Sequence, residues 1–389
     1  MIRAGRVLAL SLLVVLLAPP ACRDDVDPFL PDQRPVPGST VRLTYSPGNE
    51  RSPAWSADGD SVYYSAETFE TQPGTPGVLL RVPRTSGSAA PLLPNVQGAG
   101  SVTEHWLLAP APDPSGERLA YVEIVTTWTL HPCSTPFSGC NPPLSEVEAR
   151  LPPPRRVAVR VRGVDVPNPT AEDTSVVMDA PGVRIDSEGI RTAIVNVYPY
   201  LRHFADDAAV GFRASWSPCS SRLVLSDGLR LRTWTVGADS AVTIPNTQDG
   251  VWPAWSPGCE WIAFTRLERA DSTGATCLYT DEMGALICQQ ERTEYTVGRH
   301  ALMRIRADGT GLLDLGDGDE PAWSPDGSAL YFHREGRIWR SEPDGSNAVP
   351  VPDTEGGHEP AVSPDGRFLA FTRRGNAGTY DVWVTTLEP

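Results

Sequence analysis

A short sequence pattern recurs six times and constrains the fold more than any other feature of the chain. Its clearest copies are EPAWSPDGSALYF, which begins at Glu320, and EPAVSPDGRFLAF, which begins at Glu359. The other copies begin at Arg51, Leu108, Arg213 and Val251. The turns inside successive copies lie 57, 104, 39, 68 and 39 residues apart. Repeats of this kind indicate a solenoid or a propeller, because one unit cannot bury its apolar face alone.

Each copy has the composition of two strands joined by a tight turn. Pro is tolerated where it opens the first strand. Ser-Pro-Asp-Gly suits a turn, because Pro fixes φ and Gly accepts left-handed geometry. Alternating apolar residues such as Leu330 and Phe332 mark the second strand. Residues 337–340 and 349–351 supply two more strands around a second turn at Asp344-Gly345. Four strands per repeat predict an all-β propeller, with the Trp residues of the pattern packed between blades.

The two ends of the chain also fit a ring. The last copy supplies strands at 367–372 and 380–386 and then lacks one strand of a blade. Residues 40–45, TVRLTY, precede the first copy and have the composition of the missing strand. We therefore expect an N-terminal strand to complete the last blade and close the ring, which leaves no long unpaired edge. The interval of 104 residues holds one spare strand-like run, at 190–197, so we predict six blades rather than seven.

The pattern P-x-W-S-P-D-G-x-x-I/L-A-F resembles the TolB-like (WD-like) β-propeller repeat over about residues 39–389. The copies at Glu320 and Glu359 match it almost completely, whereas those at Arg213 and Leu108 are eroded. This resemblance implies a propeller for residues 40–389. It implies no particular activity, because one fold hosts many functions.

The first 22 residues have the features of an export signal. Arg3 and Arg6 precede an apolar run at 7–18, and small residues lead to Cys22. The apolar run is too short to span a bilayer. The segment resembles a bacterial lipoprotein signal, in which Cys22 becomes lipidated, although Pro19 departs from that pattern. An ordinary cleaved signal is the alternative. Residues 23–39, rich in Pro and Asp, would then be a spacer between a membrane anchor and the propeller.

Charge bears on the partners of an exported protein. The formal net charge is −15, which argues against nucleic acid or an anionic membrane surface as a ligand. We expect a monomer that meets the membrane only through its lipid and faces the periplasm or the cell exterior. A protein or glycan of the cell envelope is the expected partner.

The remaining cysteines form three neighbouring pairs: Cys133 with Cys140, Cys219 with Cys259, and Cys277 with Cys288. An even set in an exported chain predicts disulfides. None of the spacings is the C-x-x-C of a zinc site. Cys219 and Cys259 fall in equivalent turns of adjacent repeats, so we predict that this pair clasps two blades together.

Three insertions interrupt the repeats, at about residues 126–154, 180–208 and 269–299. The first and third fall between second and third strands and carry the other two cysteine pairs. Loops at that place emerge around the mouth of the central channel, on what we call the channel-mouth face; the Asp-Gly turns emerge on the opposite turn face. Long ordered loops on a rigid scaffold are where binding concentrates. The segment 180–208, which contains the spare strand-like run, is expected to be an elaboration on a loop.

All six histidines and two glutamates are expected on the channel-mouth face: His105, His131, His203, His300, His333, His358, Glu320 and Glu359. The first hypothesis is a non-enzymatic binding propeller without a cofactor. The alternative is a metal-dependent polysaccharide lyase or hydrolase that uses these histidines, as in the oligogalacturonate lyases, which have a related repeat. No G-x-S-x-G, H-E-x-x-H or P-loop is present, and the acidic run 314–320 lacks the ligand spacing of a calcium loop. We therefore predict no catalytic residue.

Overall fold

The computed structural model describes residues 39–46, 48–67, 77–85, 87–93, 102–128, 156–163, 174–178, 213–226, 230–274, 277–280, 286–288, 292–375 and 378–387. All regular secondary structure in these ranges is β-strand, which confirms the predicted fold class. Within the described residues there is no helix long and apolar enough to cross a bilayer.

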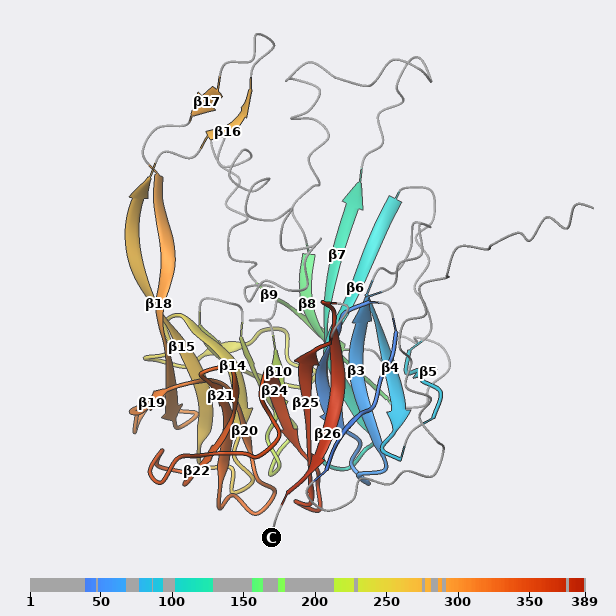
Figure 1. The fold of residues 1–389 in the computed structure, drawn as a ribbon. Coiled ribbons are helices and arrows are strands. Elements are labelled where there is room, and N and C mark those ends of the chain that lie inside the picture. The colour runs from blue at the N-terminus through green and yellow to red at the C-terminus, as the bar shows by residue number, and fades with distance from the viewer. Residues whose placement is uncertain are drawn as a thin grey trace, which may run out of the picture. The chain divides into compact units, whose positions relative to one another are not determined.

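The strands form six antiparallel blades (Figure 1). Blade 1 contains β2 (Glu50–Trp55), β3 (Ser61–Glu67), β4 (Gly77–Pro83) and β5 (Ala90–Pro91). Blade 2 contains β6 (Val102–Pro112), β7 (Arg118–Trp128), β8 (Arg156–Gly163) and β9 (Thr174–Met178). Blade 3 contains β10 (Ala214–Trp216), β11 (Arg222–Ser226), β12 (Leu231–Thr235) and β13 (Val242–Thr243). One parallel pair, Gly77 with Trp106, joins the sheets of blades 1 and 2.

The second half of the ring follows the same plan. Blade 4 contains β14 (Gly250–Trp255), β15 (Ile262–Gly274), β18 (Arg292–Ile305) and β19 (Leu313–Asp317). Blade 5 contains β20 (Asp319–Trp323), β21 (Leu330–Arg334), β22 (Arg337–Ser341) and β23 (Val349–Pro350). Blade 6 contains β24 (Gly357–Val362), β25 (Phe368–Arg374), β26 (Tyr380–Thr386) and β1 (Thr40–Arg42). The hairpin of β16 (Cys277–Thr280) and β17 (Leu286–Cys288) lies outside the blades.

Blade 6 takes its outermost strand from the N-terminal side of the propeller. Strand β1 pairs with β26, with Val41 opposite Val384. Arg42 forms an ion pair of 2.7 Å with Asp381, whose side chain is fully buried. Leu43 joins the same hydrophobic cluster as Val384. The predicted closure of the ring is confirmed, and it removes the free edge that β26 would otherwise present.

The inner strand of five blades carries a β-bulge just before its Pro-Ala step. In blade 5, Asp319 pairs with His333 and Ala322 with Tyr331, so Glu320 and Pro321 oppose a single residue. The same shift occurs in blades 1, 2, 4 and 6. The first bulge residue has φ between 49° and 55° in all five blades. We call this place, and its equivalent in blade 3, the ring position; it is occupied in chain order by Ser52, Ala109, Arg213, Trp252, Glu320 and Glu359.

Three of the four Trp residues of the pattern tie their blade to the one before it. The indole N–H groups of Trp55, Trp216 and Trp323 donate to the carbonyl oxygens of Ala361, Ala111 and Ala254, at distances of 2.9, 2.8 and 3.1 Å. Each acceptor belongs to the inner strand of the preceding blade. The repeat therefore encodes its own contact between neighbouring blades, because a buried indole needs both apolar packing and an acceptor.

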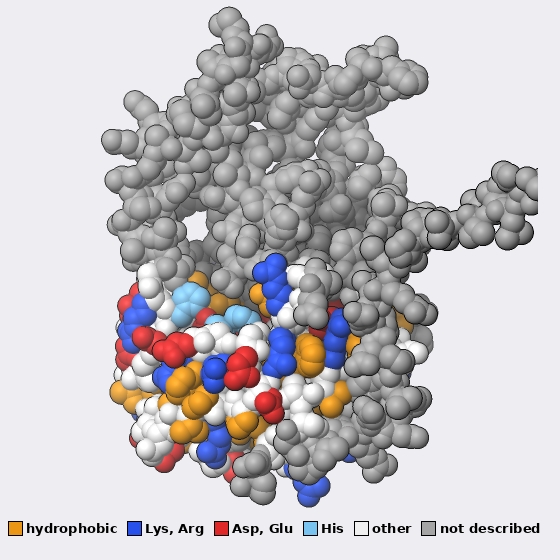
Figure 2. Space-filling model, viewed as in Figure 1, with side chains coloured by type: hydrophobic (Ala, Val, Ile, Leu, Met, Phe, Trp, Pro, Cys, Tyr) orange, Lys and Arg blue, Asp and Glu red, His pale blue; other side chains and the backbone are white. Residues whose placement is uncertain are grey.

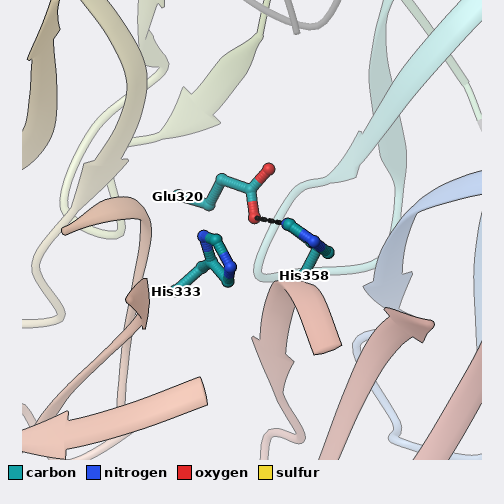
Figure 3. A group of neighbouring side chains, drawn as sticks. All are labelled: Glu320, His333 and His358. Carbon is teal, nitrogen blue, oxygen red and sulfur yellow. Dashed lines mark ion pairs between the residues drawn. The ribbon is translucent and has the colours of Figure 1, made fainter. Parts of the chain in front are cut away.

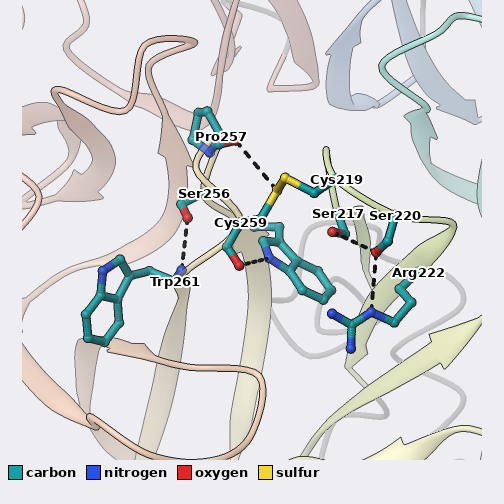
Figure 4. Close-up of a disulfide and its surroundings, with 9 residues drawn as sticks. Ser217, Cys219, Ser220, Arg222, Ser256, Pro257, Cys259 and Trp261 are labelled. Carbon is teal, nitrogen blue, oxygen red and sulfur yellow. Dashed lines mark hydrogen bonds between the residues drawn. A yellow bond between two sulfur atoms is a disulfide. The ribbon is translucent and has the colours of Figure 1, made fainter.

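The turns on the turn face contact one another around the ring. A Cβ placed on Gly327 would meet Pro257 of the preceding turn at 3.8 Å, and one on Gly366 would meet Pro325 at the same distance. In blade 4 the equivalent of these glycines is Cys259, which adopts φ of 62°. Its side chain therefore faces the turn of blade 3, where it forms a disulfide with Cys219 (Figure 4).

The insertions are described only in part. Most of 126–154 and all of 180–208 lie outside the described residues, as do Cys22, Cys133, Cys140 and the segment 1–38. Much of 269–299 is strand rather than loop, because β15 and β18 stay paired as far as Gly274 and Arg292. This ribbon rises above blade 4 in Figure 1. Cys277 and Cys288 lie opposite each other in the β16–β17 hairpin, and the disulfide between them stays a prediction.

Candidate functional site

The ring positions bring side chains of very different chemistry to the centre of the propeller. In blades 1 and 4 a hydroxyl on the second strand accepts a hydrogen bond from the ring position of the next blade: Ser65 from the Ala109 N–H at 2.9 Å, and Thr265 from the Glu320 N–H at 3.2 Å. The equivalent residue of blade 5 is His333. Because an imidazole replaces the hydroxyl there, the N–H of Glu359 is bound instead by Glu320, at 2.6 Å from Oε2.

Arg213 connects two opposite sides of the ring through its side chain. Blade 3 lies opposite blade 6 in a six-bladed ring, yet the Arg213 guanidinium donates to the carboxylate of Glu359, and at 3.2 Å to the hydroxyl of Ser52. Glu359 also accepts hydrogen bonds from the Ser52 N–H at 2.8 Å and from the Thr372 hydroxyl at 3.2 Å. Both oxygens of the Glu359 carboxylate thus accept hydrogen bonds from the protein, so this residue has a structural role. The Arg213–Glu359 ion pair, which we call the floor, therefore links two opposite blades across the centre of the ring.

Asp319 forms hydrogen bonds with two histidines at the channel mouth. Its Oδ2 lies 2.6 Å from Nδ1 of His300, and its Oδ1 lies 2.6 Å from Nδ1 of His333. Although burial acts in the opposite direction, these hydrogen bonds lower the pKa of Asp319 to about 2. An ionised carboxylate only accepts hydrogen bonds, so both Nδ1 atoms carry a proton. Asp319 therefore fixes the orientation and the tautomer of both rings.

Glu320, His333 and His358 converge beside this pair (Figure 3). One nitrogen of each imidazole and one oxygen of Glu320 all lie within 4.8 Å of one another. The two rings are 3.9 Å apart between centroids, and Nδ1 of His358 is 3.8 Å from Oε2 of Glu320. Figure 2 shows histidine side chains together at the upper margin of the described surface. We call these three residues the channel-mouth triad.

The electrostatics of the triad favour a bound cation. Burial, together with the charges of Asp319 and Glu359, raises the pKa of Glu320 to about 8. Burial, with a contribution from His333, lowers the pKa of His358 to about 4. At neutral pH the histidine is therefore uncharged, as a metal ligand must be. The Glu320 carboxyl group is mostly protonated at neutral pH, so an ion bound at the triad would displace this proton and offset the repulsion from Asp319 and Glu359.

Two imidazoles and one carboxylate are a common ligand set for divalent transition metals. Such ligands bind zinc at about 2.0–2.2 Å, and three protein ligands leave a coordination position open for an incoming group. The Asp319–His333 contact is the outer-shell hydrogen bond that usually orients a ligating imidazole. The triad, with Asp319 bound to His333, has the ligand composition of an open metal site.

The structure thus unites four of the eight residues expected on the channel-mouth face: His300, His333, His358 and Glu320. Glu359 lies below them as part of the floor. His105 belongs to β6, where only the backbone is described, and His131 and His203 lie outside the described residues. Asp319 was missed. It could have been found by aligning the repeats, since it stands one residue before a ring position and opposite a histidine that replaces a hydroxyl.

The fold and the site define a six-bladed β-propeller with a cluster of histidines and carboxylates at its channel mouth. No family model matches the sequence, and no curated protein matches it. Among solved structures, the chain is similar to a putative TolB from Agrobacterium tumefaciens, at 13% identity and a TM-score of 0.48, over 90% of this chain and 97% of that one.

Two further structures have the same level of similarity. TolB from Acinetobacter baumannii is 14% identical, with a TM-score of 0.45, and the match covers 82% of this chain and 58% of that one. The chain thus spans little more than half of that protein. An oligogalacturonate lyase from Vibrio parahaemolyticus is 8% identical, with a TM-score of 0.41, over 91% of this chain and 96% of that one. Likeness at this level carries no argument about ligand or reaction.

Proposed function

We propose that this protein is an exported binding propeller that captures a ligand of the cell envelope at its channel mouth through a divalent transition metal ion. Glu320, His333 and His358 hold the ion, and Asp319 orients His333. The observation that carries the proposal is the convergence of the three candidate ligand atoms within 4.8 Å of one another. The open coordination position receives a donor group of the ligand.

The proposed location rests on the N-terminal segment. Residues 1–22 direct export, Cys22 carries the lipid, and residues 23–39 separate the membrane from the propeller. The partner is a protein or a glycan of the envelope, and the propeller acts as a monomer. The anionic chain, with a net charge of −15, suits a protein held near the membrane by its lipid rather than by its surface.

Metal titration of the exported chain tests the proposal. After treatment with a chelator, isothermal titration with Zn²⁺ or Mn²⁺ should show one ion per chain. His333→Ala should abolish measurable binding, and Asp319→Asn should weaken it by about 10- to 100-fold, the usual effect of losing an outer-shell partner. His300→Ala is the matched control, because His300 contacts Asp319 but lies outside the triad. It should change affinity only a few-fold. Equal binding by wild type and His333→Ala would refute the proposed site.

The open coordination position also favours a second candidate function, since catalytic metal sites commonly have three protein ligands. In this alternative the protein is a metal-dependent lyase or hydrolase of an envelope polysaccharide. Incubation of the metal-loaded protein with acidic and neutral polysaccharides separates the two functions. Chain shortening that depends on His333 supports the enzyme, whereas retention of intact polysaccharide or protein supports the binding propeller.

A further inference from the structure

Arg51 is a buried cation with unused hydrogen-bonding capacity beside the channel-mouth triad. It precedes the ring position of blade 1 and is 4% exposed. Its guanidinium carbon lies 3.8 Å from the centroid of the Tyr380 ring, so one face of the group is stacked. Within the described part of the chain, its Nε and Nη2 atoms are buried and donate no hydrogen bond.

The position of Arg51 relative to the triad follows from shared neighbours. The Tyr380 ring that Arg51 covers is also 6.0 Å from the ring of His358, in an edge-on arrangement. Burial is the main cause of the lowered pKa of His358, and the charge of Arg51 adds to it. Against the effect of burial, Arg213 and Arg51 together lower the pKa of Glu359. Arg51 therefore lies within electrostatic reach of both the triad and the floor.

The carboxylates near Arg51 already have other partners. Glu359 is bound by Arg213, by Ser52 and by Thr372, and Asp319 is bound by two histidines. A buried donor without an acceptor destabilises the folded protein, and more so when it is charged. Such a group stays at this place only because the surrounding fold holds it there. Its free energy falls when a ligand supplies an acceptor.

The two unused nitrogens share one edge of the guanidinium. Nε–H and Nη2–H are parallel donors, and their spacing matches the two oxygens of a carboxylate. A lysine or a single hydroxyl could not reproduce this match. We infer that Arg51 is the anion-recognition residue of the channel mouth and binds a carboxylate group of the ligand in a bidentate pair. This inference depends on the proposed function only for the location of the ligand.

Shielding of the edge has a kinetic consequence. Both nitrogens are covered in the ligand-free protein, so a carboxylate reaches them only by displacing the covering atoms. Association should therefore be slower than the usual protein–ligand encounter, because a conformational step precedes it. Once formed, the pair is withdrawn from water, where charge-assisted hydrogen bonds are strongest.

The carboxylate can come from a sugar acid or from the C-terminus of a peptide, and the probes distinguish these sources. Glucuronate is compared with glucose, and acetyl-dialanine with its C-terminal amide, by titration into metal-loaded wild-type protein. We expect one carboxylate probe of a pair to bind and its neutral counterpart to bind at least 10-fold more weakly. Arg51→Met and Arg51→Lys should each weaken the binding of that probe by about 10- to 100-fold. The lysine variant behaves like the methionine variant because lysine keeps the charge but loses the paired donors.

Arg84→Met is the matched control, because Arg84 also stacks on an aromatic ring, Phe368, but extends from the turn end of blade 1. It should leave probe affinity unchanged. If Arg51→Met does not fold, the ¹⁵N–¹H signal of Nε in the wild-type protein should shift on addition of the binding probe. Metal binding without discrimination between charged and neutral probes, or equal affinity in the Arg51 variants, would overturn the role of Arg51 and leave the metal site standing. Failure to bind metal would instead refute the proposed function.

Discussion

Closure of the ring is tested by the ion pair that joins its two ends. Arg42 and Asp381 are separated by 339 residues in the chain, yet their side chains meet at 2.7 Å between β1 and β26. Arg42→Met leaves a fully buried carboxylate without its counterion, which costs about 3 kcal/mol. The cost stays at the lower end of the usual range because Arg42 is 27% exposed. It is also limited by protonation, because burial raises the pKa of Asp381 and loss of Arg42 raises it further.

A double-mutant cycle measures the interaction energy between the two side chains. Asp381→Asn removes the charge and leaves a partly solvated Arg42, so we expect a loss of about 1–2 kcal/mol. The double variant should lose about 2 kcal/mol, which gives a coupling energy of about 2–3 kcal/mol. Urea unfolding at pH 7, followed by tryptophan fluorescence, measures all four proteins. The exposed pair Arg84–Asp60, at 3.5 Å, is the control and should couple by under about 0.5 kcal/mol. A coupling energy for Arg42–Asp381 no larger than that of the control would show that β1 does not close the ring in solution.

Two further predictions concern stability. Burial raises the pKa of Glu50 from 4.5 to about 7, so the folded protein retains a proton that the unfolded chain has lost. Stability should therefore fall by about 3 kcal/mol as pH rises from 4.5 to above 7, and Glu50→Gln should remove this slope; urea midpoints at pH 4.5 and pH 8 that fall equally in both proteins would contradict it. The Cys219–Cys259 disulfide joins residues 40 apart. Its replacement by two serines should cost about 4 kcal/mol through loop entropy, and a melting temperature that is unchanged would argue against the clasp.

Local patterns were enough to predict the ring. The turn sequence and the Trp of the repeat each act on the adjacent blade, as the bonds from Trp55 to Ala361 and from Trp216 to Ala111 show. A contact that repeats with the sequence can be inferred from one copy. Residues 40–45 were identifiable for the same reason, because a blade with three strands exposes an edge that another strand must cover.

The site was harder to predict because it consists of departures from the repeat. His333 stands where four other blades have Ser or Thr, and Asp319 is joined to His300 across two blades. Arg213 crosses the channel to reach Glu359, a contact between opposite blades that no local pattern encodes. The sequence could place histidines on one face. It could not show that His300 and His333 share Asp319, or that His333 and His358 meet at Glu320.

The pairing inside the third insertion illustrates a different limit. Residues 269–299 were expected as a loop, yet β15 and β18 continue as a paired ribbon through the first part of it. Residues 269–274 and 292–299 show no regular alternation of apolar and polar residues in the sequence, so hydrophobic periodicity gives no signal there. Backbone hydrogen bonding between two strands that leave the same blade is sufficient to continue the ladder.

The central claim is that a metal ion sits between Glu320, His333 and His358. The most direct test is an anomalous difference map from crystals of the exported chain grown with Zn²⁺ or Mn²⁺, recorded on both sides of the metal absorption edge. The account predicts one strong peak in the channel mouth, with an imidazole nitrogen of His333, an imidazole nitrogen of His358 and a Glu320 oxygen at about 2.0–2.2 Å from it. A channel mouth without an anomalous peak, or a metal held only by other residues, would contradict it.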